Sequence, residues 1–366
     1  MPSSRAPVRE LLREIGRWQS EGEEVALATL VRVDGSAPSG PGARLACTRG
    51  GRMAGSVGPG CVESDVFLRA LEVLGEGAPA RARYGIADET ALEIGLSCGG
   101  SIELLIEPFA ADEAWRALVR AVEAERPVAL ATALSPAALR GRRLAVDAEG
   151  GRTGSIDAAL DEPARAAAQG QLAAGGTRVV ELPWRDGVAE LFLEAVGPPE
   201  RLYVVGATQI AAALSRIAPA LGFQVTIIDA RTALATRERF PEAAALVHEW
   251  PGEALAAARL DAGAYVVVLT HDPKFDVPAL VHALRSRARY VGALGSRRTD
   301  ARRRDLLREQ GLSDTELERL RAPIGLDLGG REPAEVALAI LAEIQTVRYG
   351  HEGAALCLGS GPIHGG

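Results

Sequence analysis

A duplicated segment constrains the fold of this chain more than any other feature. The first copy begins with Val-Ala-Leu-Ala-Thr at Val25, and the second begins with the same five residues at Val128. Because two copies of one backbone need the same turns and the same buried faces, we interpret what both copies share as scaffold. The shared landmarks are Arg-Leu-Ala at Arg44 and Arg143, Gly-Gly-Arg at Gly50 and Gly150, Gly-Ser at Gly55 and Gly154, and Glu-x-x-x-Glu at Glu103 and Glu190.

Two glycine-rich loops with a cysteine survive only in the first copy and are therefore candidates for function. One carries Cys61 just before a helix that we expect over 64–74, and the other carries Cys98. Glycines let backbone N–H groups converge, and the start of a helix adds positive potential, so both a thiolate and a bound anion are favoured there. The alternative for each cysteine is a small buried residue in a turn. The loop residues that we single out with the two cysteines are Gly58, Gly60, Glu63, Gly99 and Gly100.

The same comparison marks other residues as structural. Cys47 aligns with Val146 in a predicted strand, and Arg44 aligns with Arg143. We therefore interpret Cys47 and both arginines as parts of the scaffold.

Bulk composition narrows the class of protein. A formal net charge of -7 over 366 residues gives no broad cationic face, which argues against nucleic acid or an anionic membrane as the main partner. The four cysteines show no C-x-x-C pair and no histidine at zinc-like spacing, so neither a disulfide framework nor a structural zinc site is expected. No apolar run approaches the roughly 20 residues that span a bilayer. These features predict a cytoplasmic protein.

We expect an α/β chain in which an N-terminal duplicated α+β domain precedes a C-terminal Rossmann-like domain with a doubly wound parallel sheet. After a stiff Gly-Pro-Pro break at 197–199, short apolar strands alternate with helical stretches, the pattern of a parallel sheet. The expected boundaries are 1–197 for the first domain, 198–349 for the second and 350–366 for a flexible tail. Within the first domain the copies span about 21–110 and 125–197.

Candidate nucleotide-binding residues follow the first two strands expected in the second domain. Gly206 can make the first turn of a dinucleotide fold, but Thr208 stands where a glycine normally admits the pyrophosphate. Asp229 ends the next strand, at the position that binds a ribose hydroxyl in such folds. A Rossmann-like scaffold without a nucleotide remains the alternative.

Two further loops favour a shared site at the carboxyl ends of successive strands. The first, Thr-His-Asp-Pro-Lys-Phe-Asp, offers His271 as a proton carrier and Lys274 as a cation. The second places Arg297 and Arg298 where guanidinium groups could hold phosphate oxygens.

Taken together, these motifs resemble the xanthine dehydrogenase accessory factor family, known as XdhC/CoxI. The resemblance covers nearly the whole chain and includes the Gly-Cys-Val-Glu run at Cys61, Cys98-Gly-Gly, the loop from Thr270 to Asp276, and Tyr-Val-Gly-Ala-Leu-Gly-Ser-Arg ending at Arg297. It implies a protein that binds the molybdenum cofactor (molybdopterin), protects it during sulfuration and inserts it into xanthine dehydrogenase or CO dehydrogenase-type enzymes. It also implies a homodimer, a molybdenum hydroxylase client and a cysteine desulfurase partner. Two departures are the Gly-Pro-Gly before Cys61, in place of Ser-Gly-Gly, and Thr208.

Our leading hypothesis is a maturation chaperone rather than a catalyst, in which Cys61 and Cys98 contact the metal. Soft thiolate ligands, backbone amides and arginines suit the sulfur and phosphate groups of such a cofactor. The rival is an NAD(P)-dependent oxidoreductase, with Asp229 on the ribose and His271 or Lys274 transferring a proton. A third interpretation is a protein-binding scaffold with inert cysteines. The expected cofactor-binding residues are Cys61, Cys98, Gly58, Gly60, Glu63, Gly99, Gly100, Gly206, Asp229, His271, Lys274 and Arg297.

Overall fold

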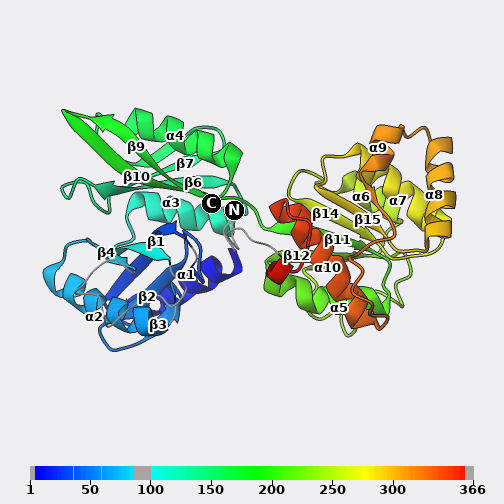
Figure 1. Ribbon diagram of the computed structural model, residues 1–366, viewed down its shortest axis with the longest axis horizontal. Coiled ribbons are helices and arrows are strands. Elements are labelled where there is room, and N and C mark those ends of the chain that lie inside the picture. The colour runs from blue at the N-terminus through cyan, green and yellow to red at the C-terminus, as the bar shows by residue number, and fades with distance from the viewer. Residues whose placement is uncertain (1–4, 36, 59, 86–99, 359–366) are drawn as a thin grey trace. The chain divides into compact units, whose positions relative to one another are not determined.

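The computed structural model describes residues 5–35, 37–58, 60–85 and 100–358. The described residues form two compact units, one ending at Pro198 and the other spanning Pro199–Leu358 (Figure 1). Among the described helices, none is long and apolar enough to cross a bilayer.

The first unit contains two copies of one seven-element pattern, each built from a helix, three strands, a second helix and two more strands. The elements of the first copy are α1 (Arg5–Ser20), β1 (Val25–Asp34), β2 (Arg44–Thr48), β3 (Met53–Gly55), α2 (Gly60–Glu76), β4 (Ala80–Tyr84) and β5 (Ser101–Pro108). Those of the second are α3 (Glu113–Glu123), β6 (Val128–Ser135), β7 (Arg143–Asp147), β8 (Arg152–Gly154), α4 (Asp161–Ala174), β9 (Thr177–Trp184) and β10 (Gly187–Val196).

Both copies fold into a five-stranded antiparallel sheet with the same strand order, β3-β2-β1-β5-β4 in the first and β8-β7-β6-β10-β9 in the second. Each sheet also has a register shift at the same place, between Leu30 and Arg32 in one and between Glu190 and Leu191 in the other. The duplication predicted from the sequence is therefore present as a structural repeat.

Strand alternation divides the apolar residues of each sheet between two cores, because successive side chains point to opposite faces. On the outer faces, alanines and leucines such as Ala28 and Leu30 pack under α2, and Ala129 and Ala131 pack under α4. On the inner faces, Leu27 and the equivalent Leu130 share one core with α1 and α3. The two copies therefore meet through their inner faces, with α2 and α4 outside (Figure 1).

The second unit is a single six-stranded parallel sheet in the order β13-β12-β11-β14-β15-β16. This is the strand order of a dinucleotide-binding fold, with the topological switch between β11 and β14. The predicted fold class is confirmed. The strands are β11 (Glu200–Val205), β12 (Phe223–Ile228), β13 (Ala245–Val247), β14 (Ala264–Val268), β15 (Tyr290–Ala293) and β16 (Leu320–Arg321).

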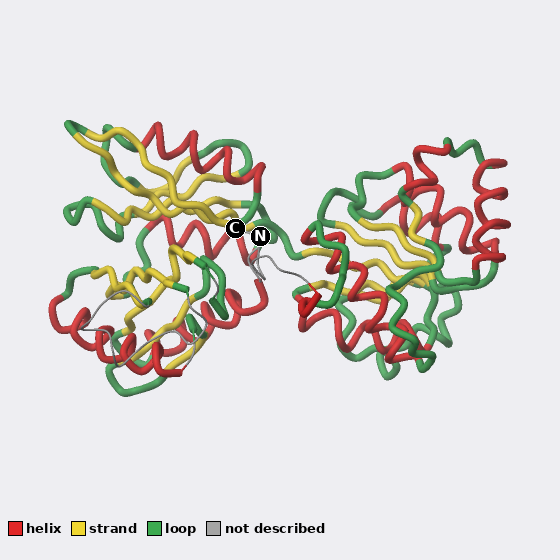
Figure 2. Tube along the Cα trace, viewed as in Figure 1, coloured by secondary structure: helices red, strands yellow, loops and turns green. Residues whose placement is uncertain are grey.

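Helices cover both faces of this sheet (Figure 2), as the continuous apolar runs of its central strands require. One core is shared with α5 and α10, and the other with α6, α7, α8 and α9. The helices are α5 (Gln209–Ile217), α6 (Pro251–Ala257), α7 (Pro273–Arg285), α8 (Arg297–Glu309), α9 (Asp314–Glu318) and α10 (Pro333–Tyr349), with short 3-10 turns at η1 (Ala218–Leu221) and η2 (Leu356–Leu358).

Candidate functional site

Two buried ion pairs join the two copies of the first unit, each between an arginine of one copy and a glutamate of the other. The Arg44 guanidinium of the first copy donates from both terminal nitrogens to the carboxylate of Glu194 in the second, with Nη1 to Oε1 at 3.0 Å. In return, Arg143 of the second copy pairs with Glu107 of the first. All four side chains are at most 6 % exposed. Each copy therefore supplies the counter-ion of the other.

An aromatic ring joins the two pairs at the centre. The guanidinium carbons of Arg44 and Arg143 both lie 5.5 Å from the ring centroid of Trp115, at the start of α3. Thr29 and Thr132, which are also equivalent in the two copies, line the same small space. The prediction that Arg44 and Arg143 belong to the scaffold is in keeping with this arrangement.

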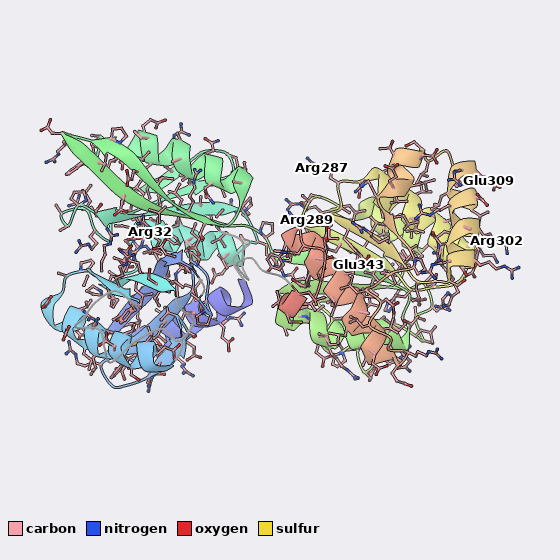
Figure 3. All side chains as sticks on the ribbon, viewed as in Figure 1. Arg32, Arg287, Arg289, Arg302, Glu309 and Glu343 are labelled. Atoms are coloured by element: carbon pink, nitrogen blue, oxygen red, sulfur yellow. The ribbon has the colours of Figure 1, made fainter. Side chains whose placement is uncertain are left out.

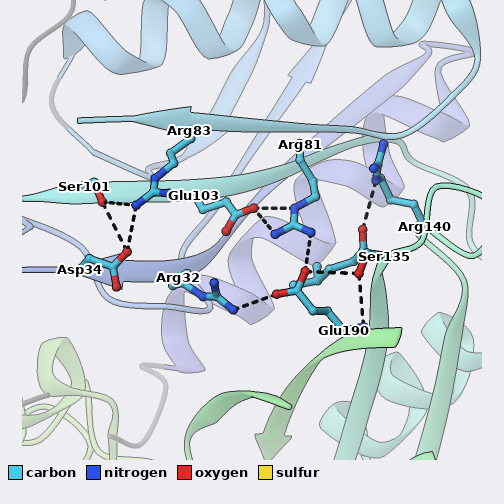
Figure 4. Close-up of polar contacts among 10 residues, drawn as sticks. Arg32, Asp34, Arg81, Arg83, Ser101, Glu103, Ser135, Arg140 and Glu190 are labelled. Carbon is cyan, nitrogen blue, oxygen red and sulfur yellow. Dashed lines mark hydrogen bonds and ion pairs between the residues drawn. The ribbon is translucent and has the colours of Figure 1, made fainter. Parts of the chain in front are cut away.

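The edge of the same contact carries a second, more exposed network (Figure 4). Glu190 accepts hydrogen bonds from Arg32 and Arg81, both of the first copy, and Arg81 also pairs with Glu103. Because these groups are partly exposed, their ion pairs are expected to contribute less than the buried exchange.

The Cys61 loop differs from its counterpart in the second copy by its length. Val62 and Leu160 are both fully buried at the start of α2 and α4, and Val57 and Ile156 are both buried before them. Four residues separate Val57 from Val62, whereas three separate Ile156 from Leu160. The Cys61 loop of the first copy is thus one residue longer than the corresponding loop of the second copy.

Cys61 lies inside the first turn of α2, because that helix begins at Gly60. The prediction of a helix beginning at Ser64 was wrong, since proline and glycine at 58–60 suggested that the loop continued further. Gly58 and Gly60 precede or open the helix, and a Cβ at Gly60 would meet nothing within 4 Å. Cys98, Gly99 and the Cys61 side chain lie outside the described residues, and Gly100 is a buried residue just before β5.

Glu63 has a counterpart in the second copy that the sequence comparison did not reveal. Its carboxylate accepts a hydrogen bond from the Ser56 hydroxyl at 2.6 Å, and Asp161 accepts one from the equivalent Ser155 at 2.7 Å. By the rule that shared features are scaffold, this interaction fastens the loop to the helix start. The one-residue difference in loop length hid the equivalence.

Cys47 is expected to be chemically inert. It is 1 % exposed in β2, and burial, assisted by the nearby Glu63 carboxylate, raises the pKa of its thiol to about 12. Since the thiolate is the reactive form, Cys47 should resist 5,5′-dithiobis(2-nitrobenzoate) at pH 8 in the folded protein and react after denaturation. The exposed Cys357 should react at once. Peptide mapping after a short labelling pulse separates the two thiols, and prompt modification of Cys47 would contradict the assignment.

In the second unit, the Gly206 turn uses its own amides. The N–H of Gly206 donates to the Ile228 carbonyl, and that of Thr208 donates to the Gly206 carbonyl. The Ala207 N–H donates to Asp229 Oδ2 at 2.8 Å. Gly206 has φ +102°, and a Cβ there would stand 2.6 Å from Thr270 Cγ2, so the turn needs glycine. These three amides are therefore engaged within the protein.

Both carboxylate oxygens of Asp229 are engaged as well. Arg231 donates from its backbone N–H and Nε to Oδ1, and from Nη2 to Oδ2, at 2.8–3.0 Å. Burial opposes ionisation of this carboxyl, but the hydrogen bonds from Arg231 and Ala207 outweigh burial and lower its pKa. Asp229 is only 3 % exposed. In this arrangement the carboxylate that would bind a dinucleotide ribose is already engaged by Arg231 and by the Ala207 N–H.

Aromatic side chains extend this edge of the sheet. Arg231 lies over Phe275, with its guanidinium carbon 5.6 Å from the ring centroid, and Phe275 stacks on Trp250 at 5.0 Å. The sequence analysis included Phe275 only as part of the 270–276 loop, did not single out Trp250 and did not predict these contacts. Their separation along the chain left no local pattern to find them by.

A buried polar chain connects α7 and α8 at the ends of β14 and β15. The Thr270 hydroxyl donates to Asp276 Oδ1, and Asp276 Oδ2 accepts from Arg303 Nη2 at 3.2 Å. Arg303 Nη2 also donates to the Leu294 carbonyl at 2.7 Å. This chain fixes the first turns of the two helices side by side.

Three predicted site residues surround that junction. His271, Lys274 and Arg297 are exposed, and among the described residues none of them has an ion-pair partner. Nothing in the described part of the chain forms a cluster of three or more metal-ligating side chains. The exposed groups here are suited to binding an anion rather than a cation.

Two protein-family models match this chain, one in each of its two units. The model of the XdhC and CoxI family matches residues 18–85, and the XdhC Rossmann domain model matches residues 202–344. The chain belongs to the XdhC and CoxI family. The family membership predicted from the sequence motifs is thus confirmed, and each family model matches one of the two units described above.

Two curated relatives of this XdhC and CoxI family member are similar to it in sequence over most of its length. It is 29 % identical over 344 residues to the molybdenum cofactor insertion chaperone PaoD of Escherichia coli, covering 94 % of this chain and 90 % of PaoD. It is 27 % identical over 331 residues to a Bacillus subtilis protein named as a probable xanthine dehydrogenase subunit, covering 89 % and 94 % respectively. A crystal structure described as a xanthine dehydrogenase from Bacillus halodurans shares the fold, with TM-score 0.71, 22 % identity and coverage of 94 % and 97 %.

Proposed function

We propose that this protein binds a molybdenum cofactor and inserts it into a molybdenum hydroxylase, protecting it while its sulfido ligand is installed. The relative PaoD, which matches nearly the whole chain, is named as a molybdenum cofactor insertion chaperone. The observation that carries the proposal to particular residues is Cys61 in the first turn of α2, in the copy that alone has a cysteine there.

The position of Cys61 suits a ligating thiolate. The first turn of a 17-residue helix carries unpaired backbone N–H groups and the positive end of the helix dipole, and both stabilise a thiolate. Molybdenum bound by sulfur is a soft centre, for which thiolate is a suitable neighbour. Cys61 and Cys98 are proposed to contact the metal-sulfur end of the cargo, with Gly58, Gly60, Gly99 and Gly100 allowing a close approach.

The client enzyme is proposed to be a xanthine dehydrogenase or CO dehydrogenase-type enzyme, with a cysteine desulfurase as sulfur donor. A cytoplasmic homodimer is the proposed form, following the family resemblance. In the second unit, His271, Lys274 and Arg297 are proposed to face the cargo, while Gly206 and Asp229 shape the neighbouring turn.

The test is the metal content of the protein purified from cells grown with molybdate. We expect wild type to retain molybdenum and Cys61→Ser to retain at least about tenfold less, because loss of a charged ligand costs more than about 1.4 kcal/mol. Cys357→Ser is the matched control, since Cys357 is exposed and far along the chain from the loop, and it should match wild type. Molybdenum in wild type no higher than in Cys61→Ser would reject the proposal.

An NAD(P)-linked oxidoreductase is the competing function. The strand order of the second unit and the acidic residue that follows β12 favour it. Against it stand the internally bonded Gly206 turn and the Arg231 fork on Asp229. Calorimetry with NAD(H) and NADP(H) at millimolar concentration decides between the two functions, and we expect no binding heat.

A further inference from the structure

Two strand ends in the second unit lead into a helix N-terminus where a phosphate group could bind, and they differ in the charge of the side chains around them. At the β11 end, Thr208 caps α5, and the N–H groups of Gln209 and Ile210 have no acceptor in the described part of the chain. The nearby arginine there, Arg231, is already paired with Asp229. At the β15 end, Ser296 caps α8 by accepting from the Thr299 N–H, and the N–H groups of Arg297 and Arg298 have no acceptor in the described part of the chain. Within the described residues, both turns therefore offer two free main-chain donors, and the side chains around them decide between the two.

The charged side chains favour the turn at the β15 end. Lys274 lies in the first turn of α7, and Arg297 and Arg298 are the first two residues of α8. All three side chains are exposed and lack an ion-pair partner among the described residues. The carboxylate of Asp272, which caps α7, is the exposed acid beside them. The junction of the two helix N-termini thus carries a surplus of positive charge, to which the helix dipoles add.

A buried guanidinium below the turn is an independent indication. Arg303 is 4 % exposed, and its Nη2 is bonded to Asp276 and to the Leu294 carbonyl. Its Nη1 has no partner within the described ranges and stands 3.5 Å from the point that a Cβ on Gly295 would occupy. A buried, unpaired N–H donor is costly unless the site that it faces provides compensation. Here it faces the turn that opens α8.

We infer that the phosphate-bearing end of the ligand binds at the first turns of α7 and α8, on Lys274, Arg297 and Arg298, and not at the Gly206 turn. Arg303 is a positioning residue that fixes the Leu294–Gly295 backbone. The inference rests on the proposed function in one respect, the identity of the ligand that carries the phosphate, which we take to be a pterin cofactor. A monoester and the diphosphate of a dinucleotide form present the same chemistry to the site.

Lys274 makes the inference directly testable, because it is the only lysine in the sequence. Reductive methylation with ¹³C-formaldehyde keeps its charge and labels it together with the N-terminal amine. Titrating the labelled full-length protein with inorganic pyrophosphate at low salt should shift the Lys274 dimethylamine resonance, with the N-terminal resonance as internal reference. Inorganic phosphate in a parallel titration distinguishes the two sources, since a diphosphate site prefers pyrophosphate and a monoester site binds both equally.

Variants then locate the site. Arg297→Gln with Arg298→Gln should weaken pyrophosphate binding by about tenfold or more, because two charge-assisted donors are lost. Arg302→Gln is the matched control. Arg302 is an exposed arginine of the same helix that points outward (Figure 3), and the variant should bind within about twofold of wild type.

The outcomes separate this inference from the proposed function. An unshifted Lys274 resonance or unchanged affinity in the Arg297/Arg298 variant would each overturn the inference, whatever the molybdenum content. The expected pattern in a protein that retains no molybdenum would keep the phosphate site and reject the cofactor-carrying function. Circular dichroism of each variant checks that the fold is intact.

Discussion

Glu194→Ala is expected to lower the free energy of unfolding by about 3–5 kcal/mol, among the largest effects of any single substitution in the first unit. The substitution removes the acceptor of both Arg44 terminal nitrogens and leaves a guanidinium that is 5 % exposed without its counter-ion. Arg44 Nε already lacks a partner among the described residues, so the remaining charge would have little compensation. Urea unfolding followed by tryptophan fluorescence measures the loss, since three of the four tryptophans lie in this unit.

The repeat supplies a second test of the same physics. Glu107→Ala should cost less than Glu194→Ala, because Arg143 keeps a second carboxylate partner, Asp112, at 3.0 Å. The paired replacement Arg44→Met with Glu194→Leu should cost much less than Glu194→Ala alone, since it removes both charges from the interior. Arg69→Ala, which breaks an exposed pair with Asp65, should change stability by no more than about 1 kcal/mol. A small effect of Glu194→Ala would show that the pair is not buried as described.

Gly55→Ala is expected to destabilise the first unit by about 3 kcal/mol or more. Gly55 ends β3 at φ +85°, where an L side chain is strained, and a Cβ there would overlap the Arg44 carbonyl oxygen. That carbonyl belongs to β2, which carries Arg44 into the central ion pair, so the backbone cannot yield without disturbing the exchange. Loss of soluble protein on expression, or a lowered midpoint of urea unfolding, would report the effect.

A nearby glycine separates strain from overlap. Gly51 has φ +88°, but a Cβ there would meet nothing within 4 Å. Gly51→Ala should therefore show only the conformational penalty, roughly 1–2 kcal/mol. Gly154→Ala should resemble Gly55→Ala, since its Cβ would stand 2.8 Å from the Arg143 carbonyl oxygen. Equal losses for Gly51→Ala and Gly55→Ala would show that overlap contributes nothing.

The sequence predicted the fold class because its strongest signals are local and repeated. The Val-Ala-Leu-Ala-Thr strands, the Gly-Gly turns and the apolar strands of the second unit each combine a period with a turn residue. The edge strand β4 was not anticipated, although Ala80, Ala82 and Tyr84 alternate with Arg81 and Arg83 in the period-2 pattern of a half-buried strand. Their partners, Glu103 and Asp34, lie on other strands and give no local signal.

Pairing between distant residues limited the prediction of the site. Comparing the copies established that Arg44 corresponds to Arg143, but not that each one binds the carboxylate of the opposite copy. Similarly, Asp229 was predicted at the end of β12, where the structure has it, whereas its fork with Arg231 depends on side-chain geometry. Sequence spacing locates a strand end, and only coordinates reveal whether its donors and acceptors are already used.

The exchange of counter-ions between the two copies bears on the ancestry of this unit. A lone first copy would leave Arg44 without the Glu194 carboxylate and would expose the apolar inner face that the two copies now share. Two identical copies related by a two-fold axis would satisfy each other, because the glutamate of each copy would pair with the arginine of the other. The first unit therefore has the form of a symmetric pair joined end to end, in which only one copy carries a cysteine at the start of its second helix.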